Sequence, residues 1–263
     1  MQLRHHNCGE AIAVIDLARM SYAHAYRVQI EHLERLVASR DSATPTPGVI
    51  LLVEHEPVIT VTPRPGAAGH VLASSSVLAD AGVDVVHTDR GGDVTYHGPG
   101  QLVVYPIIDL NAHALRIIDY IRLLEAAILD ALATFGIQAH TDPAATGVWV
   151  RSVGQPGAAL GQPAPDDAAD FSDAKIAAIG VRVRQWVSMH GLSINVDPDM
   201  AHFDLLVPCG LHGRPVTSMA RLLGARGPTM DSVKSAVVGA LRARLDERFR
   251  GRVPSAASPR LPG

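Results

Sequence analysis

A glycine-rich run at residues 89–101 holds the densest set of side chains that could do chemistry. It reads Asp-Arg-Gly-Gly-Asp-Val-Thr-Tyr-His-Gly-Pro-Gly-Gln, with arginine, threonine, tyrosine and histidine close together. Its four glycines permit positive φ angles and a close approach of the backbone to a ligand. The spacing matches neither a Walker loop nor a dinucleotide fingerprint. The run therefore indicates either a ligand-binding loop or a tight hairpin turn.

Cys209 is a candidate nucleophile because it stands between a proline and a glycine, in the segment Val-Pro-Cys-Gly-Leu. A rigid turn there would hold the sulfur in place at the tip of a loop. The alternative is a small buried hydrophobic residue, which is what most free cysteines are. The other cysteine, Cys8, is interpreted as incidental.

Lys175 opens the apolar sequence Lys-Ile-Ala-Ala-Ile-Gly-Val-Arg-Val-Arg. By default such a lysine is a solvated strand end. If its ammonium pointed into a pocket, it would lower the pKa of a neighbouring thiol, because a nearby positive charge favours the thiolate. A further segment, His-Gly-Leu-Ser-Ile-Asn-Val at 190–196, is interpreted as a hairpin corner between two strand-like runs.

Periodic apolar residues predict the elements that must position these side chains. Spacings of three and four predict helices, and a segment that is apolar on both faces, at 101–110, predicts a central strand. We expect helices at 10–39, 74–81, 116–135 and 230–249. We expect strands at 48–54, 58–61, 83–87, 101–110, 147–151, 175–184, 185–190 and 192–196.

The order of these elements predicts an α/β (α+β) protein with mixed, largely antiparallel sheets and flanking helices. Residues 1–250 are expected to form a single domain. Within it, residues 152–173 are rich in Gly, Pro, Ala and Asp without any period, which predicts a mobile insertion. Residues 251–263, with prolines and serines interspersed, predict a disordered tail.

Composition excludes several classes of protein. The chain has 263 residues, of which 47% are hydrophobic and 4% aromatic, so an aliphatic core is expected. A net charge of −3 argues against a nucleic-acid partner. Two cysteines form neither a disulfide framework nor a four-thiolate zinc site, and neither HExxH nor GxSxG occurs. We expect a cytoplasmic protein with no metal, no cofactor and no membrane partner.

Together, the motifs resemble those of the lipoyl (octanoyl) transferases, in the same order along the chain. The resemblance runs over about residues 49–218. It is carried by Arg-Gly-Gly-x-x-Thr-Tyr-His-Gly-Pro-Gly-Gln (90–101), Tyr-Pro-Ile-Ile-Asp-Leu (105–110), Gly-Val-Trp-Val (147–150), Lys-Ile-Ala-Ala-Ile-Gly (175–180), His-Gly-Leu (190–192) and Pro-Cys-Gly-Leu (208–211).

The resemblance implies the catalytic fold of biotin and lipoate protein ligases, and a role for each motif. Members move an octanoyl group from octanoyl-acyl carrier protein to a lysine on the lipoyl domains of 2-oxoacid dehydrogenase E2 subunits and of the glycine cleavage H protein. Cys209 matches the nucleophile that carries the acyl group as a thioester, and Lys175 the residue that lowers its pKa. The residues that match substrate-binding segments are Arg90, Gly91, Gly92, Asp93, Val94, Thr95, Tyr96, His97, Ala178, Ile179, Gly180, Gly191, Leu192 and Ser193.

Two departures and three alternatives accompany this interpretation. Thr60-Val61-Thr62-Pro63-Arg64 stands where the family has Thr-Leu-Gly followed by basic residues, and Ser193 stands where alanine is common. The alternatives are an ATP-dependent lipoate or biotin ligase, a cysteine hydrolase, and a non-catalytic module that binds acylated proteins. An ATP-dependent ligase would have no need of a cysteine in a Pro-Cys-Gly turn.

Overall fold

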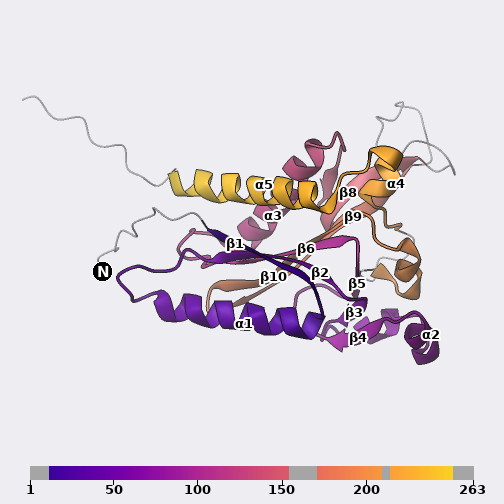
Figure 1. Ribbon diagram of the computed structural model, residues 1–263, viewed down its shortest axis with the longest axis horizontal. Coiled ribbons are helices and arrows are strands. Elements are labelled where there is room, and N and C mark those ends of the chain that lie inside the picture. The colour runs from indigo at the N-terminus through magenta and orange to yellow at the C-terminus, as the bar shows by residue number, and fades with distance from the viewer. Residues whose placement is uncertain (1–11, 154–170, 209–213, 251–263) are drawn as a thin grey trace, which may run out of the picture.

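Two β-sheets form the framework of the computed structural model, which describes residues 12–153, 171–208 and 214–250 (Figure 1). The larger sheet has seven strands in the order β1-β2-β6-β10-β9-β8-β7, and the smaller has three in the order β4-β3-β5. The strands are β1 (Ala13–Met20), β2 (Val49–His55), β3 (Val58–Val61), β4 (Asp84–His87), β5 (Thr95–His97), β6 (Gln101–Ile107), β7 (His140–Asp142), β8 (Ala145–Val153), β9 (Phe171–Arg184) and β10 (Val187–Asn195).

Helices cover both faces of the larger sheet, with α1 on one face and α3 and α5 on the other (Figure 1). Two aliphatic clusters fill the space between the sheet and these helices, and a third lies beneath the smaller sheet. The helical segments are α1 (Tyr22–Ser39), η1 (Ala67–His70), α2 (Ser75–Asp80), α3 (Ile117–Ala133), η2 (Met200–Leu205), α4 (Met219–Leu223), η4 (Gly224–Arg226) and α5 (Met230–Arg250).

The expected fold class agrees with this architecture. β6 is central, as its apolar sequence predicts: it lies between β2 and β10, and all seven of its residues are buried. The pairs β1–β2 and β3–β4 are parallel, and the other pairs of neighbouring strands are antiparallel. The helices expected at 74–81, 116–135 and 230–249 correspond to α2, α3 and α5.

The long helix expected at 10–39 is wrong in its first half. Ala13–Met20 is an edge strand that pairs in parallel with β2, and the helix starts only at Tyr22. The buried face of α1 consists of Tyr22, Ala25, Gln29, Leu33 and Leu36. Apolar spacing was misleading before residue 22 because pairing with the free edge of β2 overrides local helical preference.

The corner expected at His190–Gly191 is also wrong, because β10 is a single strand. The turn lies earlier, at Gln185 and Trp186, whose φ angles of 51° and 62° form the two-residue connection between β9 and β10. Positive φ at both central residues is the geometry that suits the right-handed twist of a hairpin. No glycine or asparagine marks this turn, so the sequence gives no signal for it.

The insertion expected at 152–173 is shorter at both ends, because residues 152–153 and 171–173 belong to strands. β8 extends to Val153 and β9 begins at Phe171, where the two strands pair with each other. Residues 154–170 and the expected tail at 251–263 lie outside the described residues. In the part of the chain that the structure describes, no helix is long and apolar enough to cross a membrane.

Gly100, just before β6, permits a close contact with the backbone of Asp197, and substitution of this glycine tests how much the contact contributes to stability. Its φ is +83°, and an added Cβ would lie 2.1 Å from the carbonyl oxygen of Asp197. We expect Gly100→Ala to lower the free energy of unfolding by about 3 kcal/mol, through backbone strain together with overpacking. The measurement is urea denaturation followed by circular dichroism.

Gly82 provides the matched control, because its φ is +63° but nothing lies within 4 Å of an added Cβ. Gly82→Ala is expected to cost about 1 kcal/mol, from backbone strain alone. Equal losses for the two variants would contradict the importance of the contact between Gly100 and Asp197.

Candidate active site

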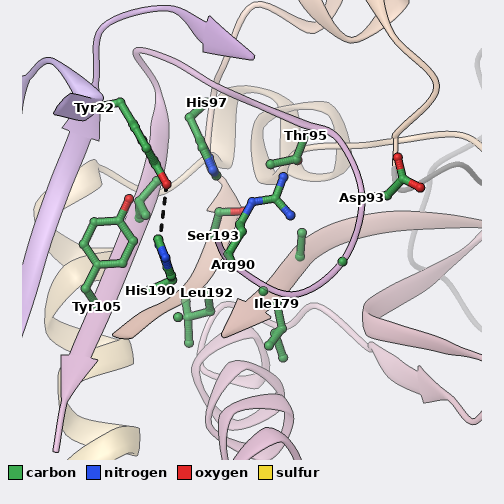
Figure 2. Close-up of a pocket in the computed structure, with 15 residues that line it drawn as sticks. Tyr22, Arg90, Asp93, Thr95, His97, Tyr105, Ile179, His190, Leu192 and Ser193 are labelled. Atoms are coloured by element: carbon green, nitrogen blue, oxygen red, sulfur yellow. Dashed lines mark hydrogen bonds between the residues drawn. The ribbon is translucent and has the colours of Figure 1, made fainter. Parts of the chain in front are cut away.

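A pocket lies between the glycine-rich run, β9 and β10, with about 470 Å³ of empty space including its open mouth (Figure 2). The three segments that the family resemblance singled out meet here although they are far apart in sequence. The lining residues are Tyr22, Arg90, Gly92, Asp93, Thr95, His97, Val103, Tyr105, Ala178, Ile179, Gly180, His190, Gly191, Leu192 and Ser193.

Backbone contact between the glycine-rich run and β9 builds one wall of the pocket. The N–H of Gly91 donates to the carbonyl oxygen of Val181 at 2.9 Å. A Cβ at Gly180 would lie 2.9 Å from the carbonyl oxygen of Gly91, so only glycine permits this approach. The guanidinium of Arg90 donates to the hydroxyl and the carbonyl oxygen of Thr60, which ties the run to β3.

Three of the expected substrate-binding residues do not line the pocket. Val94 and Tyr96 are fully buried in the core of the smaller sheet, where the Tyr96 hydroxyl lies 2.7 Å from Nδ1 of His202. Gly91 acts through its backbone contact with β9. These positions support the wall of the pocket from behind.

Sequence reasoning missed Tyr22, Val103, Tyr105 and His190 as members of the pocket. The available signals were a tyrosine on a helical stripe and a histidine beside a glycine, which indicated core packing and a corner. The φ of His190 is +55° in the middle of β10. Its neighbour Met189 packs in the cluster beneath α1, and the ring of His190 also faces α1, against Tyr26. The positive φ thus breaks strand alternation and turns His190 into the site.

Aromatic and imidazole rings gather at one side of the pocket and are held by hydrogen bonds. The hydroxyl of Tyr22 lies 2.6 Å from that of Thr88, and 3.5 Å from Nδ1 of His190 (Figure 2). Nε2 of His190 lies 2.9 Å from Asp89. The Tyr105 hydroxyl lies 2.7 Å from Nε2 of His55. This side of the pocket is therefore built from rings whose polar groups already have partners.

A buried amide network fixes the tautomer of His97. The side-chain amide of Asn195 donates to the carbonyl oxygen of Thr217, so its oxygen accepts from the amide of Gln101. The remaining oxygen of Gln101 must then accept from Nδ1 of His97 at 2.6 Å. In a neutral imidazole Nε2 is consequently an acceptor.

Burial keeps the histidines of this region neutral. Desolvation lowers the pKa of His55 to about 4 and that of His97 to about 3, the latter assisted by the nearby His55. The pKa of His190 falls to about 3, mainly through burial and further through Arg90 and Arg182. The rings therefore present a neutral, largely apolar surface at physiological pH.

A second, smaller cavity contains Lys175, which is 6% exposed. This finding corrects the default interpretation of a solvated strand end, because β9 begins four residues earlier and buries the lysine. Nζ donates to the carbonyl oxygen of Thr146 at 3.3 Å and lies 4.6 Å from the centre of the Trp149 ring. Gly147 adjoins the lysine and lies close to the same strand, since a Cβ there would lie 2.7 Å from the carbonyl oxygen of Ala177.

The two cavities share part of their lining and so adjoin each other. Thr95, Ala178 and Ser193 line both. Pro208, the residue before Cys209, lines the smaller cavity together with Lys175. Cys209 itself lies outside the described residues. The described side chains thus offer an ammonium in a small cavity that adjoins a larger pocket with ring-lined and aliphatic walls.

Metal binding has no visible basis among the described side chains, which contain no group of three or more His, Cys, Asp or Glu residues that could hold an ion.

Comparison with known proteins places the chain in a family. Residues 25–242 match the lipoyl protein ligase A/B catalytic domain. An octanoyltransferase from Solibacter usitatus is 44% identical over 206 residues, covering 78% of this chain and 81% of that protein. One from Geobacter metallireducens is 37% identical over 234 residues, covering 89% and 93%. A lipoate-protein ligase A bound with ATP has the same fold, with a TM-score of 0.62 and 13% identity over 90% of this chain and 86% of that one.

Fold and sequence together define the class: the chain belongs to the lipoyl protein ligase A/B catalytic domain family. Within that family, the matched relatives of high identity are octanoyltransferases. The resemblance to lipoyl (octanoyl) transferases and the expected ligase-like fold are both confirmed.

The neutral buried histidines predict a specific loss of stability in mild acid. Below about pH 6.5 the unfolded chain takes up protons on these residues, whereas the folded chain does not until the pH approaches 4 or 3. This stability is present above pH 6.5 and is lost as the pH is lowered, by about 1 kcal/mol per histidine between pH 6.5 and pH 5.5. Urea denaturation at pH 7 and pH 5.5 measures this change.

His55→Gln removes one of these groups and is expected to reduce the loss between pH 7 and pH 5.5 by about 1 kcal/mol. His24→Gln changes an exposed histidine on α1 and serves as the control. An identical pH dependence in wild type and His55→Gln would refute the assignment.

Proposed function

We propose that the protein transfers an octanoyl group from octanoyl-acyl carrier protein to a lysine of lipoyl-domain proteins, through a thioester on Cys209. Such transfer is the first step of endogenous protein lipoylation. The proposal rests on membership of a family whose matched relatives are octanoyltransferases. It also rests on the site geometry, which offers a separate place for the acyl chain and for the reacting groups.

One observation carries the assignment of roles. Lys175 is buried in a small cavity, and Pro208, directly before Cys209 in the chain, lines that same cavity. Through Thr95, Ala178 and Ser193 this cavity adjoins the larger pocket. A thioester carbonyl at Lys175 could therefore extend its alkyl chain past these small side chains, toward Val103, Ile179 and Leu192.

In the first half-reaction the Cys209 thiolate attacks the thioester carbonyl of the carrier-bound octanoyl group. A new carbon–sulfur bond forms, and the bond to the carrier's sulfur breaks. The ammonium of Lys175 favours the thiolate electrostatically. The proton of the Cys209 thiol passes through Lys175 to the departing carrier thiolate, so the carrier leaves as a thiol.

In the second half-reaction the amine of an acceptor lysine attacks the Cys209 thioester. An amide bond forms, and Cys209 leaves as a thiolate, which makes it a better leaving group than a serine alkoxide would be. Lys175 takes the proton of the attacking amine and completes the cycle. The acceptors are the lipoyl domains of 2-oxoacid dehydrogenase E2 subunits and the glycine cleavage H protein.

Intact-mass analysis after incubation with octanoyl-acyl carrier protein tests the covalent step. Wild type is expected to gain one octanoyl group, and Cys209→Ala to gain none, since the alanine has no nucleophile. Cys8→Ala is the matched control and is expected to acylate normally. An adduct that survives Cys209→Ala would overturn the mechanism.

The same incubation with free octanoate and ATP separates the transferase from an ATP-dependent ligase. Modification of a lipoyl domain under those conditions, without acyl carrier protein, would favour the ligase. Release of free octanoate in the presence of a lipoyl domain, with no amide product, would favour a cysteine hydrolase.

Lys175→Met is expected to slow formation of the adduct by about 100-fold or more, the usual contribution of a positioned acid or base. The chain has only one other lysine, Lys234, which pairs with Asp16 at 2.8 Å, so Lys234→Met is the matched control. The rate of adduct formation is followed by mass spectrometry of samples quenched at successive times, from pH 6 to pH 9. In Lys175→Met the rate should recover as the pH rises, because the thiol then ionises unaided. A uniform loss at every pH would indicate a merely structural lysine.

A further inference from the structure

The aromatic and imidazole rings gather at one side of the larger pocket. Tyr22, Tyr105 and His190 lie together there, whereas Thr95 and Asp93 lie at the opposite side (Figure 2). Thr95 also lines the Lys175 cavity, which Tyr22, Tyr105 and His190 do not. A chain entering from Lys175 would therefore reach these rings last.

Tyr22 is fixed in this position from several directions. Its hydroxyl lies 2.6 Å from that of Thr88, and its ring stacks on that of His97 at 6.5 Å with an angle of 5° between the planes. The ring also contacts His55 at 5.3 Å. As the first residue of α1, only 4% exposed, it is held by the helix that covers the sheet.

The two partners behind Tyr22 are held as firmly. His190 is bound through Nε2 to Asp89, which also accepts from the hydroxyl of Tyr26 and the guanidinium of Arg182. Tyr105 is bound to His55. Moving any of these rings would break at least one of these hydrogen bonds.

We propose that Tyr22, supported by His190 and Tyr105, is the end wall that limits the length of the acyl chain. The inference rests on the proposed function and deepens it, since it assigns to particular residues the selection of octanoyl over longer chains. An octanoyl chain would end against the rings. A longer chain would have to displace Tyr22 from its bond to Thr88 and its stack on His97, or leave its own end outside the pocket.

The relative rates of acylation by octanoyl- and dodecanoyl-acyl carrier protein test this inference. Wild type is expected to prefer octanoyl by more than about tenfold, since even one methylene that does not fit a hydrophobic pocket costs that much. Tyr22→Ala opens the end of the pocket and should bring the ratio close to one or reverse it. Tyr22→Phe keeps the ring and should keep the preference for octanoyl.

Trp186→Ala is the matched control, because it removes an aromatic ring that is half exposed at the β9–β10 turn, outside both cavities. It should leave the ratio unchanged. Tyr22→Leu provides a second opening variant if Tyr22→Ala does not fold, as judged by its melting temperature. With a side chain of intermediate length, it should gain decanoyl transfer before dodecanoyl transfer.

Binding of free fatty acids to Cys209→Ala separates failure of this inference from failure of the proposed function. Calorimetry should give a chain-length optimum near octanoate for Cys209→Ala, and a longer optimum when Tyr22→Ala is added. If neither wild type nor Tyr22→Ala forms an octanoyl adduct yet this shift occurs, the end-wall inference is supported and the proposed transfer chemistry is wrong. If wild type forms the adduct but Tyr22→Ala and Tyr22→Leu keep its ratio, the end wall is wrong.

Discussion

The site depends on one close contact between two stretches of backbone. The glycine-rich run lies directly against β9, where Gly91 donates to Val181 and Gly180 leaves no side chain in the way. This contact joins the smaller sheet to the larger one. It brings Arg90, Thr95 and Ala178 into the lining of one pocket. Side chains larger than hydrogen at Gly180 would push the layers apart.

Burial then determines the character of that pocket. Histidine is often a charged or exchangeable group near neutral pH, yet here desolvation lowers the pKa of His97 and His190 to about 3. One ring nitrogen of each is bound to a partner, His97 to Gln101 and His190 to Asp89. A set of polar residues thereby makes a surface suited to an alkyl chain. The same neutrality predicts a fold that is sensitive to acid, so the proposed acyl binding and the expected loss of stability share one physical cause.

The ammonium that the proposed mechanism uses lies outside the larger pocket. Lys175 lies in its own small cavity, against the Trp149 ring and the carbonyl oxygen of Thr146. Thr95 and Ser193, which line both cavities, separate the ammonium from the ring-lined end. An acyl thioester has the same division, with a polar reacting carbonyl at one end and a hydrocarbon chain beyond it. The arrangement of the site follows that of the proposed substrate.

The sequence by itself determined the family, the fold class, the central strand β6 and most of the segments that line the pocket, because these follow from local pattern and ordered motifs. Only the tertiary structure decided that Ala13–Met20 is a strand, since its partner β2 is remote in sequence. Only the tertiary structure showed that His190 faces the pocket, because its positive φ cannot be predicted from its residue type. It also brought Tyr22 to the end of the pocket. Local preference cannot encode such placements, because they arise from contacts between residues that are distant along the chain.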